Sequence, residues 1–210
     1  MCLLVTLLAA CTSNLLPEVV VEKPVCDLPY SRYQATVTGY CQEPRADLAE
    51  TVPVINKSII IKPLAQIPEV LWFHKEMNYS LLKQDGIAPV IFVIAGTGAG
   101  FDSAKMINLQ KNFYQQGYHV ISLSSPTFAN FIVNSNNTKY MPGNLAHDAQ
   151  ELYQVMTLVW QQVQEEDNVE SSSFSVTGYS LGGAHSAFVS LLDEKKKVFN
   201  FEKVLLINPP

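Results

Sequence analysis

The sequence predicts a single α/β domain in which a mostly parallel sheet carries helices on both faces. Its 210 residues are enough for one domain with a sizeable core. Hydrophobic residues make up 48% of the chain and charged residues 16%, a composition typical of globular proteins. From residue 88 onward, continuous apolar runs alternate with amphipathic segments, which is the pattern of parallel strands joined by helices.

Two early segments, YQATVTGY (33–40) and NKSIIIKP (56–63), are rich in β-branched and aromatic residues and are predicted as strands. They would form an antiparallel hairpin or an edge of the sheet. The segments EVLWFHKEM (69–77) and YSLLKQDGIA (79–88) show no clear period, and they stay unassigned. The Asp-Gly pair at 85–86 predicts a turn.

Four strands and three helices are expected to alternate in the rest of the chain. The predicted strands are APVIFVIAG (88–96), YHVISLSSP (118–126), SSFSVTGYS (172–180) and FEKVLLINPP (201–210). The predicted helices are 102–117, with Asp102 or Ser103 as N-cap and Gly117 at the end, 144–166, with Asn144 as N-cap, and 181–197. This order predicts a parallel sheet wrapped on both faces.

The charge balance argues against nucleic acid as a partner. Lys and Arg number 14 against 19 Asp and Glu, which gives a formal net charge of -5. The one basic cluster is Lys195–Lys197. A nucleic-acid interface needs a broad basic surface, which this composition does not provide.

A possible reactive group lies in the segment Gly178-Tyr179-Ser180-Leu181-Gly182, which fits the pattern G-x-S-x-G. The motif follows a predicted buried strand and opens a predicted helix, the context that a nucleophile elbow needs. Glycines are expected at 178 and 182 because side chains there would collide with the neighbouring strand or helix. The Ser180 hydroxyl should then stand exposed at the positive end of a helix.

On this motif, with the strand order as support, the chain from about Ile55 onward resembles the α/β-hydrolase superfamily. The resemblance implies that Ser180 is a catalytic nucleophile and that the Leu181 amide holds an oxyanion. The second amide would come from the glycine-rich loop GTGAG (96–100), and we expect it to be that of Thr97. No metal or organic cofactor is implied. A phosphate cradle in this loop is disfavoured by its spacing, whereas a tight turn without catalysis stays an alternative.

The family pattern places an acid and then a histidine after the serine. The candidates after Ser180 are His185, Asp193, Glu194 and Glu202. His185 should pack against the sheet or a neighbouring helix, and Asp193 and Glu194 should lie at a solvated helix end. His147 has more weight as a base than His185, because its helix begins at the same sheet edge as the elbow, although a surface histidine in a first turn is far commoner. The resemblance therefore implies an N-terminal fragment, inactive alone, whose acid and histidine lie beyond Pro210.

The opening MCLLVTLLAAC is apolar but too short to span a bilayer, and it is typical of an export signal. Leu8-Ala9-Ala10-Cys11 resembles the lipobox of bacterial lipoproteins. That resemblance implies a signal peptide over 1–10, a lipidated Cys11 and, since Thr12 follows, the outer membrane facing the periplasm. A tether over 11–32 would precede an incomplete domain over 33–210. No basic residue precedes Lys23, so an ordinary cleaved signal or a chance apolar start stays open.

Four cysteines are present, and two of them, Cys26 and Cys41, lie beyond the predicted signal. An oxidising periplasm would allow a disulfide between them, with a stabilisation of about 3 kcal/mol in the chain-entropy model. Two buried free thiols are the alternative. No Cys or His spacing predicts a metal site.

The leading functional hypothesis is an esterase-, lipase- or thioesterase-like hydrolase acting through an acyl-enzyme on Ser180. The substrate would be small or lipid-like, and acyl transfer to another acceptor would use the same groups. A non-catalytic envelope lipoprotein with this fold is the alternative. The segment 124–143 could overhang the site with Phe128, Phe131 and Val133 and bind an acyl group, or these residues could be ordinary core.

Overall fold

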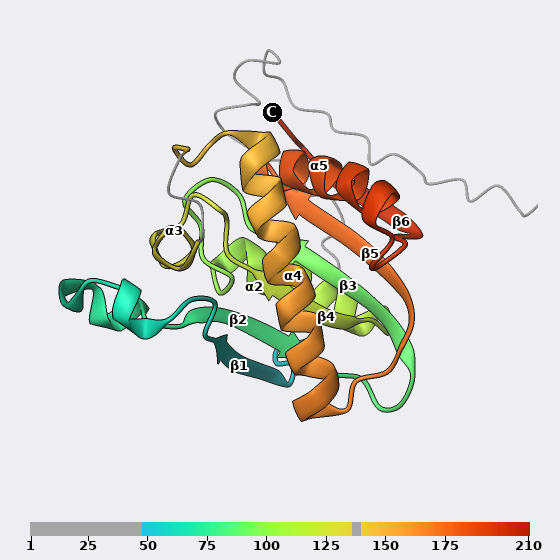
Figure 1. Cartoon of the computed structure of the whole chain (residues 1–210). Helices are drawn as coiled ribbons and strands as arrows, with labels where there is room; N and C mark the ends of the chain where they lie inside the picture. The colour runs from blue at the N-terminus through green and yellow to red at the C-terminus, as the bar shows by residue number, and fades with distance from the viewer. Residues whose placement is uncertain (1–47, 136–139) are drawn as a thin grey trace, which may run out of the picture. The chain divides into compact units, whose positions relative to one another are not determined.

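The computed structural model describes residues 48–135 and 140–210 (Figure 1). In this part of the chain, one six-stranded sheet has the order β1-β2-β4-β3-β5-β6. The strands are β1 Val54–Ile59, β2 Met77–Leu82, β3 Ala88–Ile94, β4 His119–Leu123, β5 Ser171–Tyr179 and β6 Lys203–Ile207. The helices are α2 Ala104–Gln115, α3 Ala129–Asn134, α4 Leu145–Asp167 and α5 Leu181–Lys196, with 3-10 turns η1 Leu64–Gln66 and η2 Glu69–His74.

The sheet is mostly parallel, as predicted. β4, β3, β5 and β6 are parallel neighbours, whereas β2 is antiparallel to both β1 and β4. Parallel strands need long crossovers, and α2, α4 and α5 supply them. The carboxyl ends of β3, β4, β5 and β6 therefore meet at one edge of the sheet.

Helices cover both faces of the sheet, which confirms the predicted α/β class. Phe92 and Ile94 of β3 belong to the core cluster that contains the buried hydrophobic residues of α4. Ile91 and Val93 belong to a second cluster with Met106 of α2. Figure 1 shows α4 on one side of the sheet and α2 on the other. Because both faces of the sheet are covered, the sequence of β3 is continuously apolar and does not alternate between apolar and polar residues.

The two unassigned segments fold differently from each other. Residues 69–77 contain η2, and the start of 79–88 belongs to β2, which pairs with both β1 and β4. Most of β2 is buried, so it has no exposed face to give an alternating pattern. The predicted strand 56–63 is confirmed in part by β1, an edge strand. The predicted strand 33–40 lies outside the described residues.

The other predictions for residues 1–47 also concern residues outside the described part of the chain. They are the signal peptide 1–10, the tether 11–32, the lipidated Cys11, and the disulfide between Cys26 and Cys41. Among the helices that are described, none is long and apolar enough to cross a membrane.

The buried His119 makes the stability of the fold depend on pH. Its side chain is fully buried in β4, and its Nδ1 accepts a hydrogen bond from the Gln84 amide at 3.0 Å. Burial is the main cause that lowers the pKa of His119. The folded state therefore favours the neutral ring, and this stabilisation is present above pH 6.5 and is lost as pH falls, because the unfolded chain takes up the proton.

We therefore expect protonation of His119 in the unfolded chain to lower the free energy of unfolding by up to about 1.4 kcal/mol when the pH drops from 7.5 to 5.5. His119→Gln should reduce this pH dependence, measured by urea unfolding of the full-length protein at both values. Ile121→Val, which shortens a buried side chain of the same strand without removing a titratable group, should lower the free energy of unfolding equally at both pH values. An unchanged pH dependence in His119→Gln would contradict the expectation.

Candidate functional site

Ser180 lies at the bend between β5 and α5, where it is the N-cap of the helix. Its backbone has φ 52° and ψ −128°, a positive-φ conformation that costs a non-glycine residue about 1–3 kcal/mol. The Ser180 amide donates to the Ile207 carbonyl of β6 at 2.9 Å, which fixes the bend to the neighbouring strand. The residue is exposed at the carboxyl edge of the sheet, so its hydroxyl is accessible from solvent.

The glycines on either side of Ser180 are required by close backbone approaches. A Cβ at Gly178 would collide with the Gly182 backbone and lie 2.9 Å from the Gly183 nitrogen. A Cβ at Gly182 would lie 2.6 Å from the carbonyl oxygen of Ala95, just after β3. The first turn of α5 therefore packs directly on β5 and on the end of β3, which is possible only without side chains at 178 and 182.

The amide of Leu181 is available at the start of α5. The first amides of a helix have no intrahelical acceptor, and they point out of its positive end. The Ser180 carbonyl accepts from Gly183 at 2.9 Å and from Ala184 at 3.4 Å. Within the described part of the chain, no hydrogen bond from the Leu181 amide is seen. This amide can therefore bind a negative atom near Ser180.

The glycine-rich loop 96–100 lies against the elbow. A Cβ at Gly96 would lie 2.7 Å from the Tyr179 ring, so the loop backbone touches the residue before Ser180. The loop is a tight turn in which the Ala99 amide donates to the Gly96 carbonyl at 3.0 Å and Gly98 has φ 63°. Thr97 is exposed in the middle of this turn, and its amide has no acceptor among the described residues. The structure thus brings both expected donor segments to one edge of the sheet.

The residues that hold this loop were not singled out from the sequence. Thr127 Oγ1 accepts a hydrogen bond from the Gly98 amide at 2.8 Å and lies 2.9 Å from Ser125 Oγ. The Ser125 amide donates to the Ala99 carbonyl at 3.0 Å. A signal was present in the sequence, because SSPT follows the apolar run of β4 at the same sheet edge.

Part of the segment after β4 packs on the core. Residues 129–134 form α3, and Phe131 is 1% exposed within the main core cluster. Phe128 lies beside Gly100, where a Cβ would be 3.3 Å from its ring. For Phe131 the structure therefore favours the core alternative over an acyl-binding role.

All four histidines lie in the described part of the chain, and none hydrogen-bonds Ser180. His185 is fully buried, with its Nε2 3.3 Å from Asp148 Oδ2. Burial lowers the pKa of His185, although Asp148 acts in the opposite direction. The His147 ring stacks on Tyr140 with centroids 3.4 Å apart. Within residues 48–135 and 140–210, no histidine therefore lies in position to act as a base on Ser180.

The acidic candidates have structural partners. Asp148 accepts from the Gly143 amide at 2.8 Å as well as facing His185. Asp193 is only 2% exposed, so its assignment to a solvated helix end was wrong. Its carboxylate is bound by Tyr153 and by the amides of Phe199 and Phe201. Glu194 is exposed, as expected.

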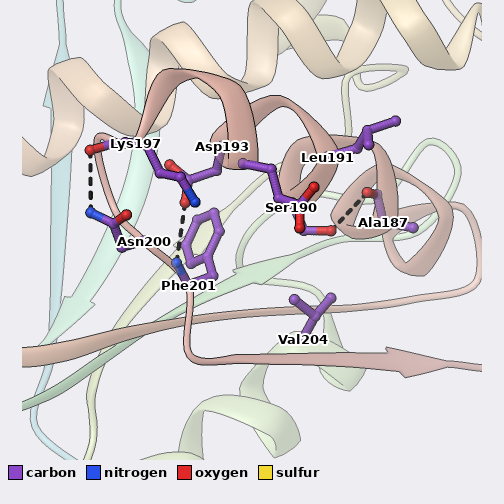
Figure 2. Close-up of a pocket in the computed structure, with 9 residues that line it drawn as sticks. Ala187, Ser190, Leu191, Asp193, Lys197, Asn200, Phe201 and Val204 are labelled. Atoms are coloured by element: carbon purple, nitrogen blue, oxygen red, sulfur yellow. Dashed lines mark hydrogen bonds between the residues drawn. The ribbon is translucent and has the colours of Figure 1, made fainter.

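Two cavities lie near α5. One of about 410 Å³ includes Ser180 and Tyr179, and it is bounded by α2 and by the end of β6. The other, of about 650 Å³, lies between α5 and β6 and does not include Ser180 (Figure 2). Within residues 48–135 and 140–210, no group of three His, Cys, Asp or Glu residues could hold a metal ion.

Searches for relatives found similarity only in structure. No family model matches the sequence, and no curated protein matches it. Brefeldin A esterase, described as a bacterial homologue of human hormone-sensitive lipase, is 15% identical over 79% of this chain and 41% of that protein, with a TM-score of 0.46.

Two further solved structures are similar at the same level. Dienelactone hydrolase from Anabaena variabilis is 14% identical over 67% of this chain and 59% of that one, with a TM-score of 0.45. A hyperthermophilic esterase from the archaeon Pyrobaculum calidifontis is 13% identical over 76% and 45%, with a TM-score of 0.46. The chain thus spans less than two thirds of each of these structures, and similarity this low does not assign it to a family.

Proposed function

We propose that the full-length protein containing this chain is a serine hydrolase of the α/β-hydrolase superfamily. It cleaves an ester, thioester or amide bond through an acyl-enzyme on Ser180. The observation that carries the proposal is the elbow itself, in which an exposed serine with φ 52° is the N-cap residue of α5 and the residue before it contacts a glycine-rich loop. Strain of this kind persists only where the surrounding backbone enforces it, and it is concentrated at functional sites.

The proposed chemistry uses the groups around the bend. Ser180 Oγ attacks the acyl carbonyl, and the oxygen of the tetrahedral intermediate accepts hydrogen bonds from the amides of Leu181 and Thr97. Each donor of this kind contributes about 10² to 10³ in rate. The leaving group departs, and water then releases the acyl group from Oγ. The positive end of α5 favours the negative charge in both steps.

The proton on Ser180 Oγ needs a base, and none of the four histidines contacts it in the structure. We therefore propose that the histidine and the acid that orients it come from outside residues 1–210. Residues 1–210 alone should then show no more than residual hydrolysis. The lack of a histidine in contact with Ser180 also supports the second candidate, an envelope lipoprotein that has the fold without a working triad.

Labelling with a fluorophosphonate probe separates the two candidates, because the probe reacts only with an activated serine. The full-length protein should be labelled at Ser180, as located by peptide mass spectrometry, and Ser180→Ala should not be labelled. Ser172→Ala, at an exposed serine of β5, should be labelled like the wild type. Absence of label from the folded wild-type protein would favour the non-catalytic candidate.

We further propose that Cys11 is lipidated and anchors the protein in the outer membrane, facing the periplasm. The support is the similarity of Leu8-Ala9-Ala10-Cys11 to a lipobox. Cells grown with radiolabelled palmitate should incorporate label into the wild type but not into Cys11→Ser. Cys2→Ser, which changes the other cysteine of the predicted signal, should keep the label. Equal labelling of Cys11→Ser would rule out this anchor.

A further inference from the structure

The side chains that line the cavity beside Ser180 favour one kind of ligand, and this preference does not follow from the elbow alone. It is lined by residues of α2, by the ends of β5 and β6, and by residue 48, namely Leu48, Lys105, Asn108, Leu109, Asn112, Tyr179, Ser180, Ile207 and Asn208. Its volume of about 410 Å³ is within the range of small-molecule sites. Apolar side chains supply part of the wall, and amides and one ammonium supply the polar part.

Lys105 is the only charged side chain among these lining residues, and no carboxylate lines the cavity. Its ammonium lies 5.3 Å from the centroid of the Tyr179 ring, a cation–π distance that holds the charge next to the residue preceding Ser180. Among the described residues, no acceptor or acidic partner of Lys105 is seen. By contrast, Lys57 and Lys111 each donate to oxygen atoms of the protein.

The neighbouring amides complete a site for an anion. Asn108 follows Lys105 by about one turn of α2, and Asn112 follows Asn108 by another, so all three lie on one face of the helix. Each amide nitrogen can donate to a carboxylate oxygen. An ammonium with no acidic partner, flanked by two amides in a partly apolar cavity, selects an anionic group over a neutral one.

We propose that the substrate carries a carboxylate in its acyl part, at the end away from the scissile carbonyl, and that Lys105 binds it. The inference rests on the proposed function, because it assigns a substrate class to the same cavity. The acyl chain would pass the apolar wall at Leu109 and Ile207 before reaching the ammonium. Lys105 is a specificity-determining residue in this scheme, and it takes no part in breaking the ester bond.

The test compares two esters that differ in charge and little in shape. Monoethyl succinate carries a carboxylate at pH 7.5, and ethyl 4-methylpentanoate has an isopropyl group in the same place. The full-length wild-type protein should show the higher kcat/KM with monoethyl succinate. Lys105→Met, which removes the charge but keeps an unbranched stem, should lower that kcat/KM about fivefold, mainly through KM. Its kcat/KM with the neutral ester should stay within about twofold.

Three further measurements separate charge from shape. Lys105→Arg should keep the preference for the charged ester, and Lys105→Glu should reverse it. Lys195→Met, at an exposed lysine of α5 outside the cavity, should behave like the wild type. The wild-type preference should also fall as salt is added, because salt screens an exposed ion pair.

The outcomes distinguish the inference from the function on which it rests. Hydrolysis of both esters with a ratio that Lys105→Met leaves unchanged overturns the carboxylate specificity and leaves the hydrolase intact. No hydrolysis of either ester, together with no fluorophosphonate label, overturns the proposed function and the inference with it. A wild-type preference for the neutral ester also overturns the inference.

Discussion

Replacing Ser180 with alanine is expected to lower the kcat/KM of the full-length protein about 10⁴-fold or more, with little change in stability. The hydroxyl is the proposed nucleophile, so its loss removes the acyl-enzyme route. Ser180 Oγ makes no capping hydrogen bond to α5, and the bend is held by the Ser180 amide, which alanine keeps. The free energy of unfolding should therefore change by less than about 1 kcal/mol, measured by urea unfolding.

A second substitution tests whether the backbone strain at Ser180 is retained because the serine is needed for catalysis. Ser180→Gly should also abolish hydrolysis, but glycine adopts φ 52° without penalty. We expect Ser180→Gly to be about 1 kcal/mol more stable than Ser180→Ala. If Ser180→Ala keeps wild-type kcat/KM, or if Ser180→Gly is the less stable of the two, the proposed role of the strained elbow is wrong.

The elbow could be predicted because its causes are local. A buried strand, a bend at Ser180 and a helix follow one another within a few residues, and Gly178 and Gly182 mark the close approaches. The strands β3 and β4 were predictable for a related reason, since their apolar runs are typical of strands buried on both faces. The last predicted strand is also apolar, but β6 is exposed over most of its length in the described part of the chain.

Features that depend on distant partners were missed. Thr127 binds the Gly98 amide across 29 residues, and no local pattern marks that contact. β2 was unassigned because its register comes from β1 and β4 and not from its own alternation. His185 was correctly expected to be packed, but its partner Asp148, 37 residues away, was not identified.

The clearest error in the sequence-based predictions concerns Asp193. The hydrogen bonds that bury its carboxylate lead us to expect a large loss of stability when Asp193 is replaced. Because Asp193 lies at the far end of its helix, remote from Ser180, we expected it at a solvated helix end. In the structure the Tyr153 hydroxyl donates to Oδ1 at 2.6 Å, and the amides of Phe199 and Phe201 donate at 3.0 and 3.1 Å (Figure 2 shows the last of these). These three donors fix the turn between α5 and β6 to α4.

We expect Asp193→Ala to lower the free energy of unfolding by about 4 kcal/mol, because three donors lose their acceptor in a buried site. Asp193→Asn keeps one acceptor oxygen and should lose about 2 kcal/mol, which gives a measurable variant even if Asp193→Ala does not fold. Glu194→Ala, at the exposed neighbouring position, should stay within about 0.5 kcal/mol of the wild type.

Tyr153→Phe removes one donor and should cost about 1 kcal/mol on its own. In the Asp193→Ala background the same change should cost almost nothing, because its partner is already gone. This double-mutant cycle, measured by urea unfolding of the full-length protein, isolates the Tyr153–Asp193 bond from the cavity that alanine leaves. Additive losses in the cycle, or an Asp193→Ala loss below about 1 kcal/mol, would show that the buried carboxylate does not hold α4, α5 and β6 together.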